Sequence, residues 1–407
     1  MRTLSVPMLL RASSNLFSGR QTASIIRSSI HRQSVCGGSR RIRLFSGNGD
    51  WNRELSKPQD FDVTAPIIRE ARILSLTDPH DTANDPVNDA AKDPSLLPEG
   101  ASLLAIGTCL EEFDMDTLKP QEPNVIFVSH PLAREPLAQL LQELPSIEWI
   151  HARSAGIDFV ASPTLASSTE VIMSNAKGTF SSTLAEYTLM ACSYFAKDLP
   201  RLLKQKADCN WTKYPVLEVR GATLGIIGYG DIGHAIARLA SAYGMKVLAL
   251  KRHVRDNDKN DPYCDAIYSS SDTDSLHRIF AESDYVVCAT PLTAETERMI
   301  GREQFDQAKE GSVFINVGRG LVVDEDALVD ALKAGKLKGA GLDVFAMEPL
   351  PTSSELWRLD NVLLSPHNMD MTETFMTEAS TFFVEENLPR FLRGIPLLNV
   401  VNKAAGY

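Results

Sequence analysis

A glycine-rich loop between an apolar strand and a helix constrains this chain more than any other feature. The loop reads Gly228-Tyr229-Gly230-Asp231-Ile232-Gly233. It follows a strand predicted over 224–227 and opens a helix predicted over 232–243. We expect Gly228 to permit a tight turn, Gly230 to let a pyrophosphate approach the backbone, and Gly233 to let helix and strand pack closely. The helix N-terminus then favours a bound phosphate, so the loop predicts a dinucleotide-binding α/β domain.

Short apolar runs recur after this loop at the spacing of a parallel sheet. Strands are predicted over 247–250, 285–289, 313–317, 339–343 and 362–364, with a helix over 326–334. Strands this apolar are typical of a sheet that is buried on both faces. The pattern predicts a doubly wound sheet whose candidate cofactor residues include all six of the glycine loop.

The segment before the loop predicts another α/β domain. Strands are expected over 71–76, 103–106 and 125–128, a helix over 136–144, and a long helix over 182–207. Between them, Asp-Pro recurs at 78–79, 85–86 and 93–94, which predicts a solvated loop or linker. The last helix, over 372–393, contains Pro389, which we expect to kink or end it.

Three further segments carry side chains with complementary chemistry. They are Arg319 in Asn316-Val317-Gly318-Arg319-Gly320, Glu348 in Phe345-Ala346-Met347-Glu348-Pro349, and His367 in Ser365-Pro366-His367. Hydride transfer to a 2-oxo acid requires a cation that holds a carboxylate, an imidazole that moves a proton, and a carboxylate that tunes the imidazole. Flanking glycines should let Arg319 approach a ligand closely. We therefore take Arg319, Glu348 and His367 as candidate catalytic residues, with a structural ion pair as the alternative role for the arginine.

In order and spacing these segments resemble the D-isomer-specific 2-hydroxyacid dehydrogenase family, in particular its glyoxylate/hydroxypyruvate reductase branch. The resemblance covers about 300 residues, the size of two ordinary domains, and includes Ser154-Ala155-Gly156-Ile157-Asp158 and Ala185-Glu186-Tyr187. It implies an NAD(P)-dependent oxidoreductase that gives D-2-hydroxy acids from small 2-oxo acids. It also implies two Rossmann-like or flavodoxin-like domains: a substrate domain at 65–181 and 370–400, with the nucleotide domain at 182–369 inserted in it, and the active site in the cleft between them.

The resemblance also assigns roles to single residues. Glu348 becomes the ionised partner of His367, and Arg319 binds the substrate together with the backbone N–H groups of Ala155 and Gly156. Asp343 contacts the nicotinamide carboxamide, and the cofactor cleft is lined by Thr290 and Val317. A homodimer is implied as well. One departure from the family pattern leaves the identity of the substrate undetermined. The family commonly continues its Pro-His with short segments of small residues that include glycine, whereas this chain has His367-Asn368-Met369-Asp370-Met371-Thr372.

The end of the second nucleotide-domain strand bears on the choice of cofactor. An acid there usually holds the ribose 2′-hydroxyl of NAD, but this chain has Leu250-Lys251-Arg252-His253. Lys251 and Arg252 suit a 2′-phosphate, so we expect NADP(H). The alternative is that both cations are ordinary surface residues and that NAD(H) is accepted too.

The N-terminus has the composition of an organelle transit peptide. Its first 49 residues contain no Asp or Glu but hold arginines at positions 2, 11, 20, 27, 32, 40, 41 and 43. We predict a transit peptide over 1–50, cleavage near Phe45 and a mitochondrial matrix protein. Loss of these eight charges would change the formal charge from −11 to −19, which argues against nucleic acid as a partner. Cysteine spacing predicts no metal site, and no apolar run reaches the ~20 residues of a membrane span.

Two other functions remain open at this point. A phosphoglycerate dehydrogenase-like enzyme would use the same catalytic residues on a phosphorylated substrate. Some relatives act instead as dinucleotide-sensing corepressors, which are binding proteins that retain the fold. The fold alone does not separate a catalyst from such a sensor.

Overall fold

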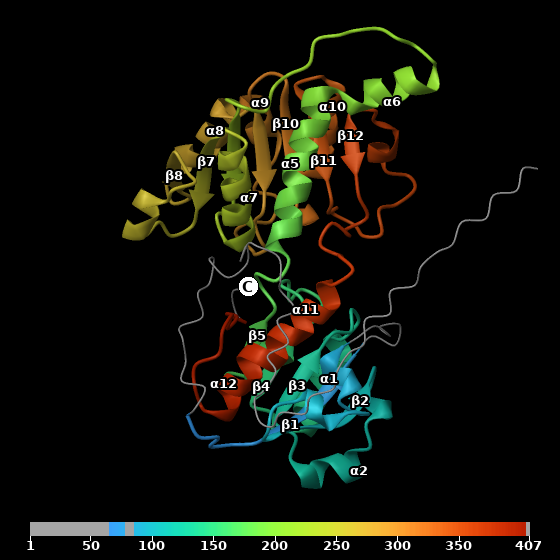
Figure 1. Cartoon of the computed structure of the whole chain (residues 1–407), viewed down its shortest axis with the longest axis vertical. Coiled ribbons are helices and arrows are strands. Elements are labelled where there is room, and N and C mark those ends of the chain that lie inside the picture. Colours follow the sequence, from blue (N-terminus) through green and yellow to red (C-terminus); the bar gives the residue numbers. More distant parts are fainter. Residues whose placement is uncertain (1–64, 78–84, 404–407) are drawn as a thin grey trace, which may run out of the picture. The chain divides into compact units, whose positions relative to one another are not determined.

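The protein was analysed as a computed structural model that describes residues 65–77 and 85–403. The predicted transit peptide lies outside these residues. All strand pairings given for the two sheets are parallel, and helices alternate with the strands along the chain (Figure 1). The prediction of an α/β protein with two parallel, doubly wound sheets is confirmed.

The first sheet has five strands in the order β2-β1-β3-β4-β5. This is the flavodoxin-like order, in which the chain reverses direction beside the first strand. Its strands are β1 (Ala71–Leu76), β2 (Ala101–Gly107), β3 (Val125–Val128), β4 (Trp149–Ala152) and β5 (Ile172–Asn175). Its first helices are α1 (Pro86–Asp89), α2 (Met115–Leu118), α3 (Arg134–Glu143) and α4 (Pro163–Ser167), with 3-10 turns at η1 (Pro94–Leu96), η2 (Leu110–Glu112) and η3 (Lys119–Gln121).

The second sheet has seven strands in the order β12-β11-β10-β9-β6-β7-β8. The strand order reverses between β6 and β9, which is where a doubly wound sheet binds its ligand. The strands are β6 (Thr223–Ile227), β7 (Lys246–Lys251), β8 (Ala266–Ser269), β9 (Tyr285–Cys288), β10 (Ser312–Asn316), β11 (Leu337–Leu342) and β12 (Val362–Leu364). Helices of this part are α5 (Ser181–Lys197), α6 (Leu199–Ala207), α7 (Asp231–Ala242), α8 (Thr273–Glu282), α9 (Arg302–Gln307) and α10 (Glu325–Lys333), with 3-10 turns η4 (Asp256–Asn260), η5 (Gly320–Val322) and η6 (Glu355–Arg358).

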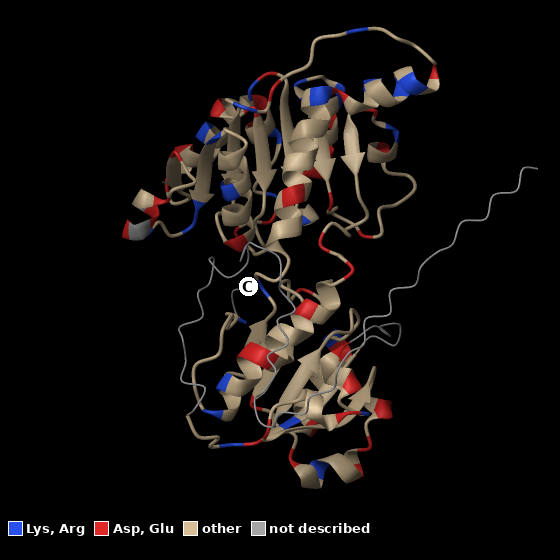
Figure 2. Ribbon diagram, in the orientation of Figure 1, with Lys and Arg blue, Asp and Glu red and all other residues tan. Residues whose placement is uncertain are grey.

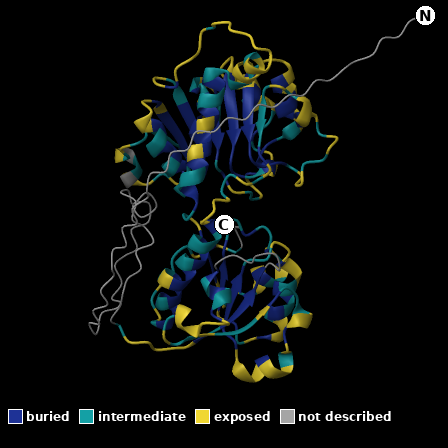
Figure 3. Cartoon of the chain, turned by 45° about the vertical axis from the view of Figure 1, so that its right-hand side comes forward, coloured by how far each residue is buried: buried dark blue, intermediate teal, exposed yellow. Residues whose placement is uncertain are grey.

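Apolar side chains cover both faces of the seven-stranded sheet. One cluster joins α5 and α7 to the sheet through residues such as Phe195 and Ile236, and a second joins α8, α9 and α10 through Phe280, Phe305 and Leu328. The central strands of both sheets are correspondingly dark in Figure 3, which marks buried residues, whereas the edge strands β2, β8 and β12 are mostly of intermediate burial. Burial on both faces explains why these strands are continuous apolar runs rather than alternating ones.

The C-terminal helices return to the five-stranded sheet. They are α11 (Phe375–Phe382), the π-helical turn η7 (Phe383–Asn387) and α12 (Leu388–Leu392). Phe391 stacks on Trp149 of β4 with ring centroids 5.1 Å apart, and Phe383 packs on the same ring in a tilted orientation at 5.0 Å. The chain therefore leaves the first sheet after β5, builds the second, and completes the first at its end.

Three local expectations differ from the structure. The helix expected over 182–207 breaks at Asp198, which adopts a left-handed φ of 53° just before α6, whose first turn contains Pro200. The helix expected over 372–393 is interrupted by the π-helical turn, and Pro389 lies in the first turn of α12. The Asp-Pro segment is not wholly solvated, because Asp85 is 3% exposed and pairs with Arg153 at 2.7 Å. This buried ion pair replaces the hydration that an acidic loop would otherwise need.

Acidic and basic residues are interspersed along the described elements in Figure 2, without a continuous basic stripe there. Within the part of the chain that the structure describes, no helix combines the length and apolar character needed to cross a bilayer.

Candidate functional site

The predicted catalytic residues follow the carboxyl ends of neighbouring parallel strands. Arg319 follows β10, Glu348 follows β11 and His367 follows β12, and these strands pair in that order. In a parallel sheet the carboxyl ends lie at one edge, so residues up to 48 positions apart in sequence can meet there.

His367 and Glu348 form a hydrogen-bonded pair. Nδ1 of His367 lies 2.7 Å from Oε2 of Glu348, and Oε1 of Glu348 accepts from the amide of Phe345 at 2.9 Å. The two side chains are 38% and 35% exposed, which is open enough for a small molecule to reach them. His367 also adopts a left-handed φ of 50°, a conformation that is uncommon for residues other than glycine and that often occurs at functional sites. With Nδ1 engaged, Nε2 is the nitrogen that remains for a substrate.

The pair shifts both pKa values in the direction that favours charged partners. The hydrogen bond to Glu348 raises the pKa of His367 above its ordinary value, although burial and the Arg319 charge act against this. Burial would raise the pKa of Glu348, but hydrogen bonds from His367 and Phe345, with the charges of His367 and Arg319, bring it below its ordinary value. The imidazole is therefore held as an imidazolium to higher pH than a free histidine, as a proton donor requires.

The glycines beside Arg319 have a packing role that differs from the expected one. A Cβ on Gly318 would lie 2.6 Å from the carbonyl oxygen of Thr290, and a Cβ on Gly320 would overlap the carbonyl group of Phe345. These glycines let the β10 loop press against two neighbouring backbones. They position Arg319 through this packing rather than by leaving room for a ligand.

Arg319 contacts the predicted substrate-binding loop directly. Its Nε donates to Oδ2 of Asp158 at 2.7 Å, its Nη1 donates to the carbonyl of Gly318 at 2.8 Å, and a Cβ on Gly156 would overlap its Nη2. The carbonyls of Ala155 and Gly156 accept from Asn175 and Ser154. Their N–H groups show no hydrogen-bond partner among the described residues. Two such N–H groups beside a guanidinium form a site with the chemistry to bind a carboxylate.

The glycine loop fits a dinucleotide. Gly228 has a φ of 97°, a Cβ on Gly230 would meet nothing within 4 Å, and a Cβ on Gly233 would overlap the carbonyl of Gly228. The backbone at Gly230 is thus open to a ligand, while Gly228 and Gly233 serve the turn and the contact between helix and strand. Gly230 is the N-cap of α7, so the helix N-terminus faces this opening. Asp231 begins α7 and pairs with Lys177 at 3.2 Å, and Ile232 packs on the core.

Lys251 lies in a different environment from the one expected. Its Nζ pairs with Oδ1 of Asp258 at 2.7 Å, and the hydroxyl of Tyr229 donates to Oδ2 of Asp261 at 2.9 Å. Burial opposes ionisation of Asp258, but the amide of Arg255 and the ammonium of Lys251 leave its pKa below the ordinary value. The loop after β7 is thereby bonded to the glycine loop through Asp261 and to the end of β7 through Asp258. Asp258 also neutralises the charge of Lys251.

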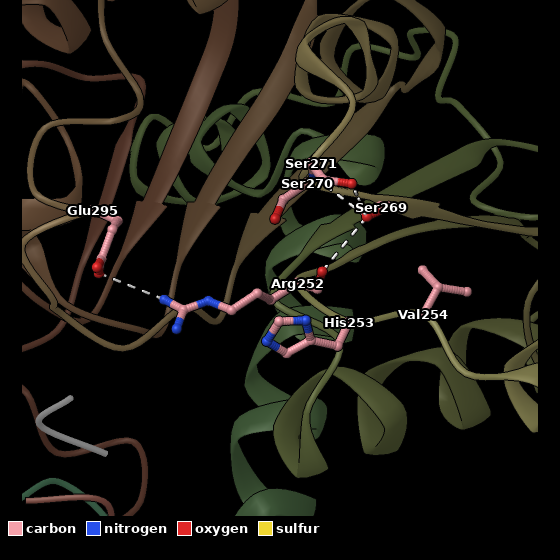
Figure 4. A pocket seen from close by; sticks show the side chains of 7 residues that line it. All are labelled: Arg252, His253, Val254, Ser269, Ser270, Ser271 and Glu295. Atoms are coloured by element: carbon pink, nitrogen blue, oxygen red, sulfur yellow. Dashed lines mark hydrogen bonds and ion pairs between the residues drawn. The ribbon is translucent and has the colours of Figure 1, made fainter.

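Arg252 lies in a pocket beyond the end of β7. The cavity measures about 730 Å³ and is lined by Arg252, His253, Val254, Ser269, Ser270, Ser271 and Glu295 (Figure 4). Arg252 Nη2 lies 3.7 Å from Glu295, whose side chain is 74% exposed, so this ion pair is weak. A guanidinium, an imidazole and three hydroxyls suit an anion such as a phosphate ester.

The other proposed cofactor contacts are a buried carboxylate that orders a turn and two side chains that hold the sheet and its core together. Asp343 is 2% exposed and accepts from Ser365 Oγ at 2.7 Å and from the Asn368 amide at 3.1 Å, so it orders the turn after His367. Thr290 donates to the carbonyl of Ile227, which holds the segment after β9 to the end of β6, and Val317 belongs to the apolar core. The side chains of Thr290 and Val317 therefore stabilise the backbone around the site and are not themselves placed as cofactor contacts. Within the described residues no cluster of His, Cys, Asp and Glu is arranged to hold a metal ion.

Comparison with known proteins gives a consistent picture. The model of the NAD-binding domain of D-isomer specific 2-hydroxyacid dehydrogenases matches residues 189–368. A glyoxylate reductase of Korarchaeum cryptofilum is 31% identical over 310 residues, covering 72% of this chain and 91% of that protein. A glyoxylate/hydroxypyruvate reductase B of an Enterobacter species is 33% identical over 269 residues, covering 65% and 80%. This chain belongs to the D-isomer specific 2-hydroxyacid dehydrogenase family.

A solved member of this family has the same fold. The 2-hydroxyacid dehydrogenase of Xanthobacter autotrophicus, crystallised with NADPH and MES, superposes with a TM-score of 0.67 at 26% identity. The match covers 83% of this chain and all of that one. As a member of the family, this chain is an NAD(P)-dependent enzyme.

Sequence reasoning missed Asp158 and Ser365. Asp158 belongs to a motif for which only backbone N–H groups were given a role. Its side chain bonds to Arg319, which lies 161 positions away in the sequence. Ser365 precedes Pro366-His367, and a polar residue that begins the turn of a catalytic histidine is a signal that could have identified it.

Proposed function

We propose that this protein reduces a small 2-oxo acid of the glyoxylate/hydroxypyruvate type to the D-2-hydroxy acid, with NADPH as the preferred cofactor. The observation that carries the proposal is the 2.7 Å contact between His367 and Glu348, which holds a proton donor within reach of the Arg319 charge. The dinucleotide, when bound, supplies the hydride. The relatives that bear the names of glyoxylate and hydroxypyruvate reductases support this substrate class.

Different residues bind the substrate and transfer the proton to it. Arg319 and the N–H groups of Ala155 and Gly156 bind and orient the carboxylate, which fixes the ketone relative to His367. Nε2 of His367 donates its proton to the carbonyl oxygen as that oxygen gains charge. Glu348 stays ionised, holds Nδ1–H and stabilises the imidazolium before the proton leaves.

The pocket around Arg252 supports the cofactor preference. The residues Leu250-Lys251-Arg252-His253 at the end of β7 include no acid to hold a ribose 2′-hydroxyl, and Arg252, His253 and the serines of 269–271 offer a guanidinium, an imidazole and hydroxyls instead. Arg252 rather than Lys251 is the principal cation for a 2′-phosphate, because Arg252 lines the pocket itself whereas Lys251 is paired with Asp258.

Steady-state reduction assays test the proposed function. The full chain would be assayed with NADPH and NADH against glyoxylate, hydroxypyruvate, pyruvate and phosphohydroxypyruvate. We expect the highest kcat/KM with glyoxylate or hydroxypyruvate and NADPH. Preference for phosphohydroxypyruvate would favour the phosphoglycerate dehydrogenase alternative, and dinucleotide binding without turnover would favour a sensing role.

A homodimer is part of the proposal. Apolar side chains are exposed on α6 and on the segment that follows it, including Leu203 at 61%, Trp211 at 94% and Leu217 at 56%. Exposed apolar patches on soluble proteins commonly mark interfaces. Light scattering should give twice the chain mass, and Trp211→Ser should shift the equilibrium toward monomer. A monomeric wild-type protein would exclude this part.

We place the protein in the mitochondrial matrix. The acid-free N-terminal segment with eight arginines supports import, and it lies outside the described residues. N-terminal sequencing of protein recovered from its native cells should find a start near Phe45. A start at Met1 would contradict import with cleavage.

A further inference from the structure

A carboxylate faces Arg252 across the pocket beyond β7, although this pocket suits an anion. The carboxylate belongs to Glu295, which lies in the segment after β9 and lines the same cavity of about 730 Å³. Arg252 Nη2 lies 3.7 Å from Oε2 of Glu295, and Figure 4 shows the charged ends of the two side chains directed toward one another. The pocket therefore presents a cation and an anion to the same ligand.

The pocket lies at the edge of the sheet where a dinucleotide binds. Strands β7 and β9 pair with β6 on its two sides, and the glycine loop over 228–233 follows β6. The segments that follow β7 and β9 therefore flank the glycine loop at the point where the strand order reverses. In such sheets the end of the second strand, here β7, holds the ribose 2′ group of the dinucleotide.

Hydrogen bonds fix the turn that carries Glu295 and orient its carboxylate. The buried Thr296 donates through Oγ1 to the carbonyl of Pro291 at 2.7 Å and accepts from the amide of Thr293 at 2.8 Å. Thr293 Oγ1 in turn donates to Oε2 of Glu295 at 2.8 Å. That hydrogen bond lowers the pKa of Glu295, and the charge of Arg252 acts in the same direction. The pocket thus contains an ionised carboxylate at neutral pH.

NADPH and NADH differ in the group that would meet this carboxylate. The 2′-phosphate of NADPH is attracted by Arg252 and repelled by Glu295. The 2′-hydroxyl of NADH can donate a hydrogen bond to a carboxylate and gains little from a cation. The residues at 250–253 include no acid that could accept from this hydroxyl, whereas Glu295 brings a carboxylate into the same pocket from another strand.

We propose that Glu295 is a specificity-determining residue, which supplies the acid that the end of β7 lacks and so limits the preference for NADPH over NADH. This inference rests on the proposed function, in which Arg252 holds the 2′-phosphate. With NADH bound, Glu295 accepts from the ribose 2′-hydroxyl. With NADPH bound, Glu295 gives up its contact with Arg252, and its remaining repulsion weakens the binding that Arg252 provides. One pocket therefore accepts both dinucleotides.

Dinucleotide affinity in the absence of a 2-oxo acid tests this role without turnover. Wild type and Glu295→Gln, both as the full chain, would be titrated with NADPH and NADH by following nicotinamide fluorescence. Glutamine keeps the size of the side chain and removes its charge. We expect Kd for NADPH to fall by roughly 5-fold and Kd for NADH to rise by roughly 2-fold, which changes their ratio by about 10-fold.

The matched control is Glu297→Gln. Glu297 is exposed and lies two positions away, but it is not among the residues that line the pocket. Its substitution removes the same charge from the same segment, so the ratio of the two Kd values should stay within about 2-fold of wild type.

Two adenosine nucleotides locate the effect at the ribose 2′ position. Calorimetry would measure the binding of adenosine 2′,5′-bisphosphate and of 5′-AMP, neither of which contains nicotinamide. Glu295→Gln should bind the bisphosphate roughly 5-fold more tightly than wild type does, while 5′-AMP should bind no more tightly.

The outcomes separate this inference from the proposed function. An unchanged ratio in Glu295→Gln overturns the role of Glu295, and so does an equal loss of affinity for both dinucleotides. An equal shift in Glu297→Gln also overturns it, because the effect would then come from net charge. If the ratio shifts as expected but no 2-oxo acid is turned over, the role of Glu295 holds and the proposed function fails. Absence of binding of either dinucleotide to wild type contradicts both.

Discussion

Arg319 Nε and Asp158 Oδ2 lie 2.7 Å apart, although Arg319 follows a strand of the seven-stranded sheet and Asp158 follows a strand of the five-stranded sheet. The carboxylate engages the Nε side of the guanidinium and leaves Nη2 against Gly156. This contact orients the planar cation toward the N–H groups that would bind a substrate carboxylate. Asp158 is thus a positioning residue that acts through Arg319.

Loss of this contact should impair substrate binding more than turnover. Asp158→Asn keeps the shape of the side chain but weakens the bond to Nε, so the guanidinium is less well oriented. We expect KM for the 2-oxo acid to rise by roughly 10-fold with a smaller change in kcat. Glu99→Gln, at an exposed position of the same part of the chain, serves as the control. Equal KM values for the two variants would exclude the positioning role.

The pH dependence of reduction should report the His367 and Glu348 pair. Because the pKa of His367 is raised, the proton-donating form persists above about pH 6.5, and the rate falls as pH rises through the raised pKa. Glu348→Gln removes the main cause of the shift, so the falling limb of kcat/KM against pH should move to lower pH. An unmoved limb would assign that titration to another group.

Cofactor selectivity should depend on Arg252 more than on Lys251. Arg252→Ala removes a cation from the pocket beyond β7, and we expect at least about a 10-fold loss of kcat/KM with NADPH and a smaller loss with NADH. Lys251→Ala should have a weaker effect, because Asp258 already neutralises that charge. A larger NADPH defect in Lys251→Ala would reverse the assignment.

Substitution of two glycines of the dinucleotide loop should affect different properties, dinucleotide binding in one case and stability of the fold in the other. A Cβ on Gly230 would meet nothing within 4 Å, so Gly230→Ala should retain its Tm while its dinucleotide Kd rises. A Cβ on Gly233 would overlap the Gly228 carbonyl, so Gly233→Ala should lower Tm by several degrees, in proportion to roughly 1–3 kcal/mol of overpacking. Calorimetric melting and fluorescence titration with NADPH would measure both. Similar melting losses in the two variants would contradict the division of roles.

The sequence was most informative where a local pattern has one physical solution. The glycine loop and the apolar strands predict a doubly wound sheet, which the structure contains, and in it Arg319, Glu348 and His367 follow β10, β11 and β12. The helix break at Asp198 had a local signal in Pro200, whereas the burial of Asp85 was not predictable, since it depends on the distant Arg153.

Counter-ions were the least predictable part of the site. Lys251 and Arg252 are adjacent and chemically alike in sequence, yet one pairs with Asp258 inside a tied-down loop and the other lines an open pocket. The approach of Asp158 to Arg319 likewise joins loops 161 positions apart. Such contacts depend on how separate loops fold over one another, which no local spacing encodes.

The most direct test compares wild type with His367→Asn in the reduction of glyoxylate and hydroxypyruvate by NADPH, with dinucleotide Kd and Tm measured on the same samples. If Nε2 of His367 donates the proton, kcat should fall by roughly 100-fold or more while Kd and Tm stay close to wild type. Near-normal turnover by the variant would contradict the central claim that His367, held by Glu348, is the proton donor.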